Sequence, residues 1–410
     1  MKYIEGGVTA PLGFTAAGLH VGVKTRNPEK LDVALIAADV LCNTAAAYTK
    51  NVVKAAPIIV TREHLQNGQA RAIIANSGNA NACAPGGEEN ARRMCAAAAG
   101  ALGIVETDVL VASTGVMGQT LPVAKIEAAA PELAARLSRG GSDDAARAIM
   151  TTDTVKKEVA LECEIGGKTV RIGGIAKGSG MIHPNMGTLL AFITTDCSIS
   201  REMLNAALLS AVRESFNRIS VDGDTSTNDT AIVMASGHAG NAEITGFGED
   251  YDVFADALRA LCVRFAREMA SDGEGAKHLI TCTVSNTENE GKAETLAKSV
   301  ISSTLFKAAI FGADANWGRA LCAMGYSGEA FDPDRVDVSF RSAAGTIEVC
   351  RDGLGLAFDE TLAKAVLTEH DIEVLIDLHE ETTPGECGLC TCWGCDITYD
   401  YIKINGDYRT

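Results

Sequence analysis

The chain has 410 residues, of which 47% are hydrophobic and 22% charged, as in a globular protein with one large domain or two to three smaller ones. Its 36 Lys and Arg against 53 Asp and Glu give a net charge of −17, which argues against nucleic-acid binding and against adhesion to anionic membranes. No apolar stretch predicts a membrane span, and no secretory signal is visible. We therefore expect a cytoplasmic protein whose 13 cysteines stay reduced.

Strand-like apolar runs alternate with helical patterns through the first half of the chain. The Ala-rich segment 88–102 predicts a helix, and a second helix is expected over 122–137, with Pro122 in its first turn. A Gly166-Gly167 turn joins two runs that predict a hairpin, 159–165 and 168–175. Further strands are expected at 33–38, 72–75, 109–112 and 189–194.

The second half repeats this style. One apolar helical face is spaced 4, 3, 4 and 4 residues apart, at Phe254, Leu258, Leu261, Phe265 and Met269. Another helix is expected over 294–310. Strands are expected at 279–284, 336–340, 346–350, 372–378 and 399–404. The pattern as a whole predicts a mixed α/β fold.

The loop from Lys177 to Thr188 lacks the Gly-Lys-Ser/Thr spacing of a phosphate-binding loop. It ends in Gly187 and Thr188, directly before a buried strand. A threonine hydroxyl can attack the carbonyl that precedes it, and glycine leaves that carbonyl sterically open. The freed threonine amine can then act as the general base. The alternative is an ordinary surface loop.

Ser113-Thr114-Gly115 follows a predicted strand and precedes a predicted helix. Backbone N–H groups at such a turn can converge on an oxyanion. A simple strand-to-helix turn is the competing interpretation. A later segment, 220–230, has the aspartate spacing of a calcium loop but lacks its Gly and Glu positions, so hydrogen-bonded turns are the better interpretation.

Four cysteines lie in the nine-residue segment Cys387–Cys395 with the spacing C-x2-C-x-C-x2-C. Their thiolates could hold zinc or an iron–sulfur cluster. Typical structural zinc sites, however, draw two ligand pairs from separate elements. Free cysteines in a glycine-rich loop are therefore the alternative for Cys387, Cys390, Cys392 and Cys395.

Together these motifs resemble the ornithine acetyltransferase family, also called glutamate N-acetyltransferases, of arginine biosynthesis. The similarity runs nearly end to end, in the same order. It covers the segments 6–11, 76–82, 113–115, 150–153, 177–188, 220–230, 272–276, 316–319 and 399–405.

The resemblance implies a layered mixed-sheet α/β fold and self-cleavage between Gly187 and Thr188. The products would be two intertwined fragments, 1–187 and 188–410, assembled as a homo-oligomer. Thr188 would be the nucleophile, and Thr114 and Gly115 would form the oxyanion hole. Substrate contacts map to Thr151, Lys177, Thr188, Glu274, Asn405 and Thr410.

The implied reaction transfers acetyl from N-acetylornithine to glutamate through an acetyl-Thr188 intermediate. No cofactor or metal is expected, and the use of acetyl-CoA as a second donor stays open. Two features depart from the family pattern: Gly187 stands where Ala is common, and Cys387–Cys392 replace smaller residues. Three rivals remain. Two are a self-cleaving aminopeptidase or amidase and a metal-binding redox protein built on Cys387–Cys395. The third is a structural relative that has lost catalysis, against which the presence of Thr114, Lys177, Thr188 and Glu274 argues.

Overall fold

The computed structural model describes residues 1–25, 29–183, 189–380 and 387–406. These residues form two compact units that alternate along the sequence, and the division between them passes through one long helix, α6 (Glu249–Ser271). Unit 1 comprises residues 1–178, 184–217 and 225–265. Unit 2 comprises residues 179–183, 218–224 and 266–410.

Unit 1 is built on a mixed sheet of nine described strands in the order β1-β6-β7-β8-β10-β3-β4-β5, with β2 also paired to β3. The pairs β4–β5 and β8–β10 are parallel. The strands are β1 (Lys2–Ile4), β2 (Phe14–Leu19), β3 (Val33–Tyr48), β4 (Gln69–Asn79), β5 (Val109–Val116), β6 (Lys157–Ile165), β7 (Lys168–Lys177), β8 (Leu190–Thr195) and β10 (Thr230–Ala235).

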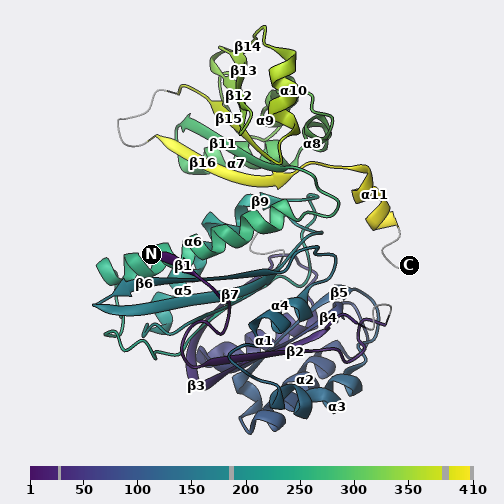
Figure 1. Cartoon of the computed structure of the whole chain (residues 1–410), viewed down its shortest axis with the longest axis vertical. Coiled ribbons are helices and arrows are strands. Elements are labelled where there is room, and N and C mark those ends of the chain that lie inside the picture. The colour runs from purple at the N-terminus through teal and green to yellow at the C-terminus, as the bar shows by residue number, and fades with distance from the viewer. Residues whose placement is uncertain (26–28, 184–188, 381–386, 407–410) are drawn as a thin grey trace. The chain divides into compact units, whose positions relative to one another are not determined.

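Both faces of this sheet are covered, which explains its continuous apolar strands. Val33 and Leu35 of β3 face one core, while Ala34 and Ile36 face the other. Helices α1 (Ala56–His64), α2 (Gly87–Leu102) and α3 (Val123–Ala135) pack on the first face, and α4 (Ser142–Ile149) packs on the second (Figure 1). The unit also contains α5 (Arg201–Glu214).

Strands from both sides of residues 187 and 188 meet in this sheet. β7 pairs with β8 in antiparallel register, and Lys177, the last residue of β7, is the partner of Leu190, the first residue of β8. The two expected fragments therefore contribute neighbouring strands to one sheet, as an intertwined fold requires.

Unit 2 is a second mixed sheet, in the order β14-β13-β12-β15-β11-β16-β9, with four of its helices packed on one face. Its strands are β9 (Ile219–Ser220), β11 (Leu279–Thr287), β12 (Asp337–Ser342), β13 (Gly345–Arg351), β14 (Leu354–Gly355), β15 (Asp371–Asp377) and β16 (Gly388–Cys395). Its helices are α7 (Glu290–Ser302), α8 (Thr304–Phe311), α9 (Trp317–Gly325), α10 (Glu360–Thr368) and α11 (Tyr399–Gly406).

Most predicted elements are confirmed, and the five residues of the predicted apolar face in α6 are fully buried. Three expectations were wrong. The single helix expected over 294–310 is two helices, because the Ser303 hydroxyl caps α8 by accepting the Phe306 N–H at 3.3 Å. Residues 399–404 form helix α11, where Thr398 Oγ1 accepts the N–H groups of Asp400 and Tyr401. Residues 388–395 form the paired strand β16, where a loop was expected.

Candidate active site

The expected oxyanion residues lie at the end of the parallel β4–β5 pair, where the ladder is irregular. Asn79 is opposite both Thr114 and Val116, so Gly115 sits in a bulge. Gly115 has φ +129°, and a Cβ at this position would approach Gly78 C to 2.4 Å. Only glycine fits here without a shift of the backbone.

Buried amide side chains, which the sequence analysis did not single out, hold this bulge in place. Ser113 Oγ donates to Asn76 Oδ1 at 2.6 Å, and Asn76 Nδ2 donates to the Asn79 carbonyl at 2.9 Å. Asn228 Nδ2 donates to the carbonyls of Ala80 and Ser113 at 2.6 and 2.8 Å. The asparagine-rich segment 76–81 was the available signal, because buried amides that bond backbone carbonyls fix loop geometry.

Lys177 ends β7 beside the same bulge. Its side chain is buried, and its Nζ donates to Thr114 Oγ1 at 3.5 Å. Among the described residues, no carboxylate lies within ion-pair distance of this ammonium group. Lys177 and Thr114, predicted from separate motifs, are thus brought together within unit 1.

Asp153 connects Lys177 to Thr151. Its Oδ2 accepts the Thr151 N–H at 3.0 Å, and its Oδ1 accepts the Gly178 N–H at 2.8 Å and Lys157 Nζ at 2.9 Å. Burial alone would raise the pKa of the Asp153 carboxyl, but Lys177, Lys157 and the Thr151 N–H outweigh burial and hold it well below its usual range. We call Asp153, Lys157 and Lys177 the lysine cluster.

Lys24 adds a further cation near this cluster. A Cβ on Gly78 would approach Lys24 Cγ to 2.8 Å, so the lysine stem passes over the glycine that is paired with Gly115. Burial lowers the pKa of Lys24 to about 8, although the Asp32 carboxylate opposes the shift. Lys177 also lowers this pKa and Asp153 raises it, which shows that the three groups share one electrostatic environment.

Glu274 and Asn405 come together in unit 2. Asn405 Nδ2 donates to Glu274 Oε2 at 2.8 Å, and the Glu274 N–H donates to the Ser179 carbonyl at 3.0 Å. A Cβ on Gly180 would lie 2.3 Å from the Glu274 carboxyl carbon. Gly180 therefore provides the space that this buried carboxylate occupies. We call Gly180, Glu274 and Asn405 the glutamate cluster.

The segment before the proposed cleavage point is anchored within unit 2. The Asp222 carboxylate accepts the N–H groups of Met181 and Ile182 at 2.6 and 2.9 Å. The hydrogen-bonded turns expected in 220–230 are present as well, since the Asp224 N–H donates to Asp222 Oδ1 at 3.2 Å. His183 Nδ1 lies 3.1 Å from Ser220 Oγ. Burial lowers the pKa of His183 to about 4, so this ring is neutral at pH 7.

Three predicted site residues, Gly187, Thr188 and Thr410, lie outside the described residues. Thr114, Gly115, Thr151 and Lys177 belong to unit 1, and Glu274 and Asn405 belong to unit 2.

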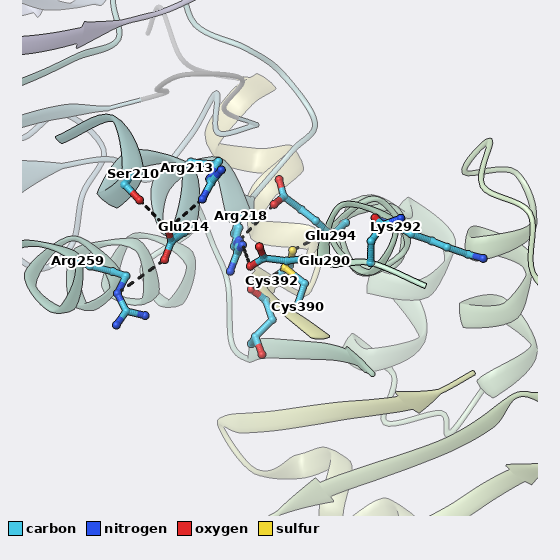
Figure 2. Close-up of polar contacts among 12 residues, drawn as sticks. Ser210, Arg213, Glu214, Arg218, Arg259, Glu290, Lys292, Glu294, Cys390 and Cys392 are labelled. Carbon is cyan, nitrogen blue, oxygen red and sulfur yellow. Dashed lines mark hydrogen bonds and ion pairs between the residues drawn. The ribbon is translucent and has the colours of Figure 1, made fainter. Parts of the chain in front are cut away.

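The cysteine motif is part of the unit 2 sheet. Cys390 and Cys392 of β16 are buried on the face that packs against α7, and Figure 2 shows them near Arg218, which pairs with Glu290 and Glu294 of α7. A hydrogen bond with Cys390, together with burial, raises the pKa of the Cys392 thiol. Protonated thiols are poor metal ligands.

The remaining two cysteines of the motif point elsewhere. Cys387 is exposed with its Sγ 2.9 Å from Asn286 Oδ1, and Cys395 Sγ lies 3.9 Å from the buried Lys307 Nζ. Within residues 1–25, 29–183, 189–380 and 387–406, no group of three or more His, Cys, Asp or Glu side chains could hold a metal ion. The same residues contain no helix long and apolar enough to span a membrane.

The mixed α/β fold and the glycine bulge beside a buried lysine are compatible with an acyltransferase, and comparison with known proteins gives the family. The ArgJ family model matches residues 15–410, and the chain belongs to this family.

Curated relatives match the chain from end to end. The arginine biosynthesis bifunctional protein ArgJ of Symbiobacterium thermophilum is 50% identical over 100% of both chains. The protein of the same name from Caldanaerobacter subterraneus subsp. tengcongensis is 48% identical, again over 100% of both chains. The crystal structure of ArgJ from Bacillus halodurans is 42% identical with a TM-score of 0.50, and it covers 54% of this chain and 100% of that chain.

These findings confirm the predicted family, the mixed α/β fold and an acyltransferase of arginine biosynthesis. They also answer the question that the sequence left open, in favour of a bifunctional enzyme. They decide against an aminopeptidase or amidase, and against a metal-binding redox protein, as the main function.

Proposed function

We propose that the chain cleaves itself between Gly187 and Thr188 and then uses Thr188 to move acetyl groups to glutamate. N-acetylornithine is one donor, and acetyl-CoA is the donor in the second activity of this bifunctional family. Residues 1–187 and 188–410 are the two fragments of the mature enzyme.

One observation supports the proposal most directly. Lys177 pairs with Leu190 in the β7–β8 ladder, and the Lys177 ammonium contacts Thr114 beside the Gly115 bulge. The chain thus leaves the sheet and returns to it at one ladder position, next to the expected oxyanion residues. Only Leu189 separates Thr188 from the start of β8.

In the self-cleavage step, Thr188 Oγ attacks the Gly187 carbonyl carbon and the peptide C–N bond breaks, which leaves an ester. Water hydrolyses this ester to a Gly187 carboxylate and restores the Thr188 hydroxyl. Thr188 then carries a free α-amine with a reference pKa of ~7.7–8.0, suited to act as a general base near neutral pH.

In the transfer step, Thr188 Oγ attacks the acetyl carbonyl of N-acetylornithine while its α-amine takes the hydroxyl proton. Thr114 and the Gly115 N–H stabilise the oxyanion. Such donors are worth about 3–4 kcal/mol each in other acyl-transfer enzymes. The C–N bond breaks, ornithine leaves with the proton, and acetyl-Thr188 remains. The amine of glutamate attacks this ester and regenerates the Thr188 hydroxyl.

Charge complementarity supports the substrate contacts. Lys177 pairs with the substrate α-carboxylate. Thr151 is tied to the end of β7 because Asp153 accepts the N–H groups of both Thr151 and Gly178, the residue after Lys177. The Glu274 carboxylate and the C-terminal carboxylate of Thr410 pair with the side-chain ammonium of ornithine, with Asn405 orienting Glu274. The two fragments stay together after cleavage and assemble further as a homo-oligomer in the cytoplasm.

Intact-mass spectrometry with an acetyl-exchange assay tests the proposal. Wild-type protein should consist of fragments 1–187 and 188–410, and the second fragment should gain the mass of one acetyl group when quenched during turnover. Thr188→Ala should remain one chain without acetyl transfer. Thr188→Ser should cleave more slowly, because it keeps the hydroxyl but loses the methyl that restricts χ1.

The exposed Thr368 of α10 offers a matched control, and Thr368→Ala should behave as wild type. An uncut wild-type chain with full activity would refute self-processing.

A further inference from the structure

A buried carboxylate that contacts neither of the expected reacting groups links the two expected substrate contacts of unit 1. Asp153 accepts the N–H of Thr151 through Oδ2 and the N–H of Gly178, the residue after Lys177, through Oδ1. Its side chain is fully buried, as is that of its ion-pair partner Lys157, only 2% exposed. The Thr151 loop and the end of β7 are therefore fixed to one another through a single side chain.

We propose that Asp153 is the positioning residue of the substrate-carboxylate site, setting the spacing of Thr151 and Lys177 and aiming the Lys177 ammonium at Thr114. Asp153 binds no substrate atom itself. The inference rests on the proposed function, since that proposal makes Thr151 and Lys177 the carboxylate contacts.

The charges of the lysine cluster support this role. One buried carboxylate faces two ammonium groups, Lys157 and Lys177, and it forms its close ion pair with Lys157. The Lys177 ammonium is left with a neutral hydroxyl, Thr114 Oγ1, as its described hydrogen-bond partner. The cluster alone therefore holds one excess positive charge in a buried place, which an arriving substrate carboxylate would balance.

A second buried aspartate shows what a purely structural role looks like. Asp196 also accepts two backbone N–H groups, from Arg171 at 2.7 Å and Leu12 at 3.0 Å. Burial raises the pKa of Asp196, whereas the neighbouring lysines lower that of Asp153. Arg171 and Lys177 are six residues apart on β7, about 20 Å along a strand, so Asp196 is a matched control that lies away from the lysine cluster.

A double-mutant cycle on the full chain tests the proposal. Asp153→Asn, Lys177→Met and the double variant are compared by kcat and KM for N-acetylornithine, per mole of cleaved enzyme. We expect each single change to raise KM about tenfold or more with a smaller effect on kcat. If Asp153 acts through Lys177, the double variant should lose no more than about threefold beyond the worse single variant.

The control cycle replaces Asp153→Asn by Asp196→Asn. Asp196→Asn should lower the melting temperature, leave KM near the wild-type value, and combine with Lys177→Met by simple multiplication of their effects on kcat/KM. A structural role for Asp153 would give this same pattern.

Asp153→Asn removes the buried carboxylate that pairs with the Lys157 ammonium, which can prevent folding. The variant Asp153→Asn/Lys157→Met removes both charges and restores a neutral pair, so the same cycle can be run in a Lys157→Met background. The raised KM and the non-additivity with Lys177→Met should persist there.

Two results would overturn the inference, and they are distinguishable. If the losses from Asp153→Asn and Lys177→Met multiply in either background, Asp153 acts independently of Lys177 while the proposed function stands. If Lys177→Met leaves kcat/KM unchanged, the proposed role of Lys177 fails, and the positioning role of Asp153 fails with it.

Discussion

The lysine cluster of unit 1 and the glutamate cluster of unit 2 differ in charge and in how they are anchored. Lys157 and Lys177 lie at strand ends, and Asp153 anchors this region through three close contacts, with Lys157 Nζ and with the N–H groups of Thr151 and Gly178. Glu274 lies in a short connection after α6, and its partner Asn405 is an exposed residue of α11. The difference indicates that the proposed carboxylate-binding and acyl-transfer groups are held rigidly, while the proposed side-chain recognition groups depend on neighbouring loops.

Disrupting the Gly115 bulge should produce the largest loss of activity. In Gly115→Ala the new Cβ would collide with the Gly78 backbone, so the bulge must open and its N–H groups move. Loss of oxyanion donors predicts a fall in kcat of about 10²–10³-fold, measured by acetyl exchange. Gly118→Ala is the control, since Gly118 also has a positive φ but open space around it. Near-normal kcat in Gly115→Ala would exclude this turn from catalysis.

A substitution in the glutamate cluster should have a smaller effect on activity. Gly180→Ala places a methyl group against the Glu274 carboxylate, which can shift because it ends a flexible side chain. We expect the KM for N-acetylornithine to rise about tenfold with self-cleavage retained, as the lost charge-assisted contact predicts. Gly246→Ala, in open space, should match wild type. A fall in kcat at constant KM would contradict the recognition role of Glu274.

Substitutions of buried cysteines in the unit 2 sheet should lower stability without changing acetyl exchange. Cys390→Ala and Cys392→Ala each remove a buried sulfur from the core and should cost about 1 kcal/mol, a shift of about 2–4 °C in melting temperature. Acetyl exchange should be unchanged at low temperature. The exposed Cys387→Ala is the control and should change neither property. Stoichiometric metal in the wild-type protein, lost in Cys390→Ala, would show that these thiols bind a metal.

As the pH falls, stability that depends on His183 in unit 2 should be lost at a higher pH than stability that depends on Asp153 in the lysine cluster. The pKa of His183 is about 4 in the folded chain against 6.5 for free histidine, so below pH 6.5 the unfolded chain binds a proton that the folded chain does not. Stability is therefore lost as pH falls from 6.5 to 4, whereas Asp153 contributes its stability until pH falls below ~3.9.

For a partly exposed ring the effect of His183 on stability is on the order of 1 kcal/mol. Urea unfolding at pH 7 and pH 5 should show a smaller loss in His183→Asn than in wild type. An equal loss in both proteins would remove His183 as the cause.

Much of the fold was predictable because buried strands of unit 1 are continuous apolar runs, and because α6 has an unbroken apolar face. The failures have local causes. Tyr399–Ile404 alternates like a strand, but the Thr398 hydroxyl caps a helix there. The cysteine-rich strand β16 contains glycines that suggest a loop, and only pairing with β11 and β9 makes it a strand.

The candidate site was predictable where motifs resemble a family, and not where tertiary contacts decide the role. Lys177 and Thr114 were predicted from separate motifs, but their contact depends on sheet order. Asp153 has three neighbours that lie two, four and twenty-five residues away in the sequence. Its role as their common acceptor follows only from the folded chain.

The pairing of Lys177 with Leu190 determines how firmly two fragments produced by cleavage after Gly187 would stay associated. A cut after Gly187 severs no rung of the β7–β8 ladder, so dilution alone should not release the pieces. Each piece lacks strands that the other supplies, so neither can bury its apolar faces alone. Once separated in denaturant, the pieces would have to find each other again by diffusion. The intact precursor folds in a single-molecule event, while the mature enzyme would recover with a half-time that shortens as protein concentration rises.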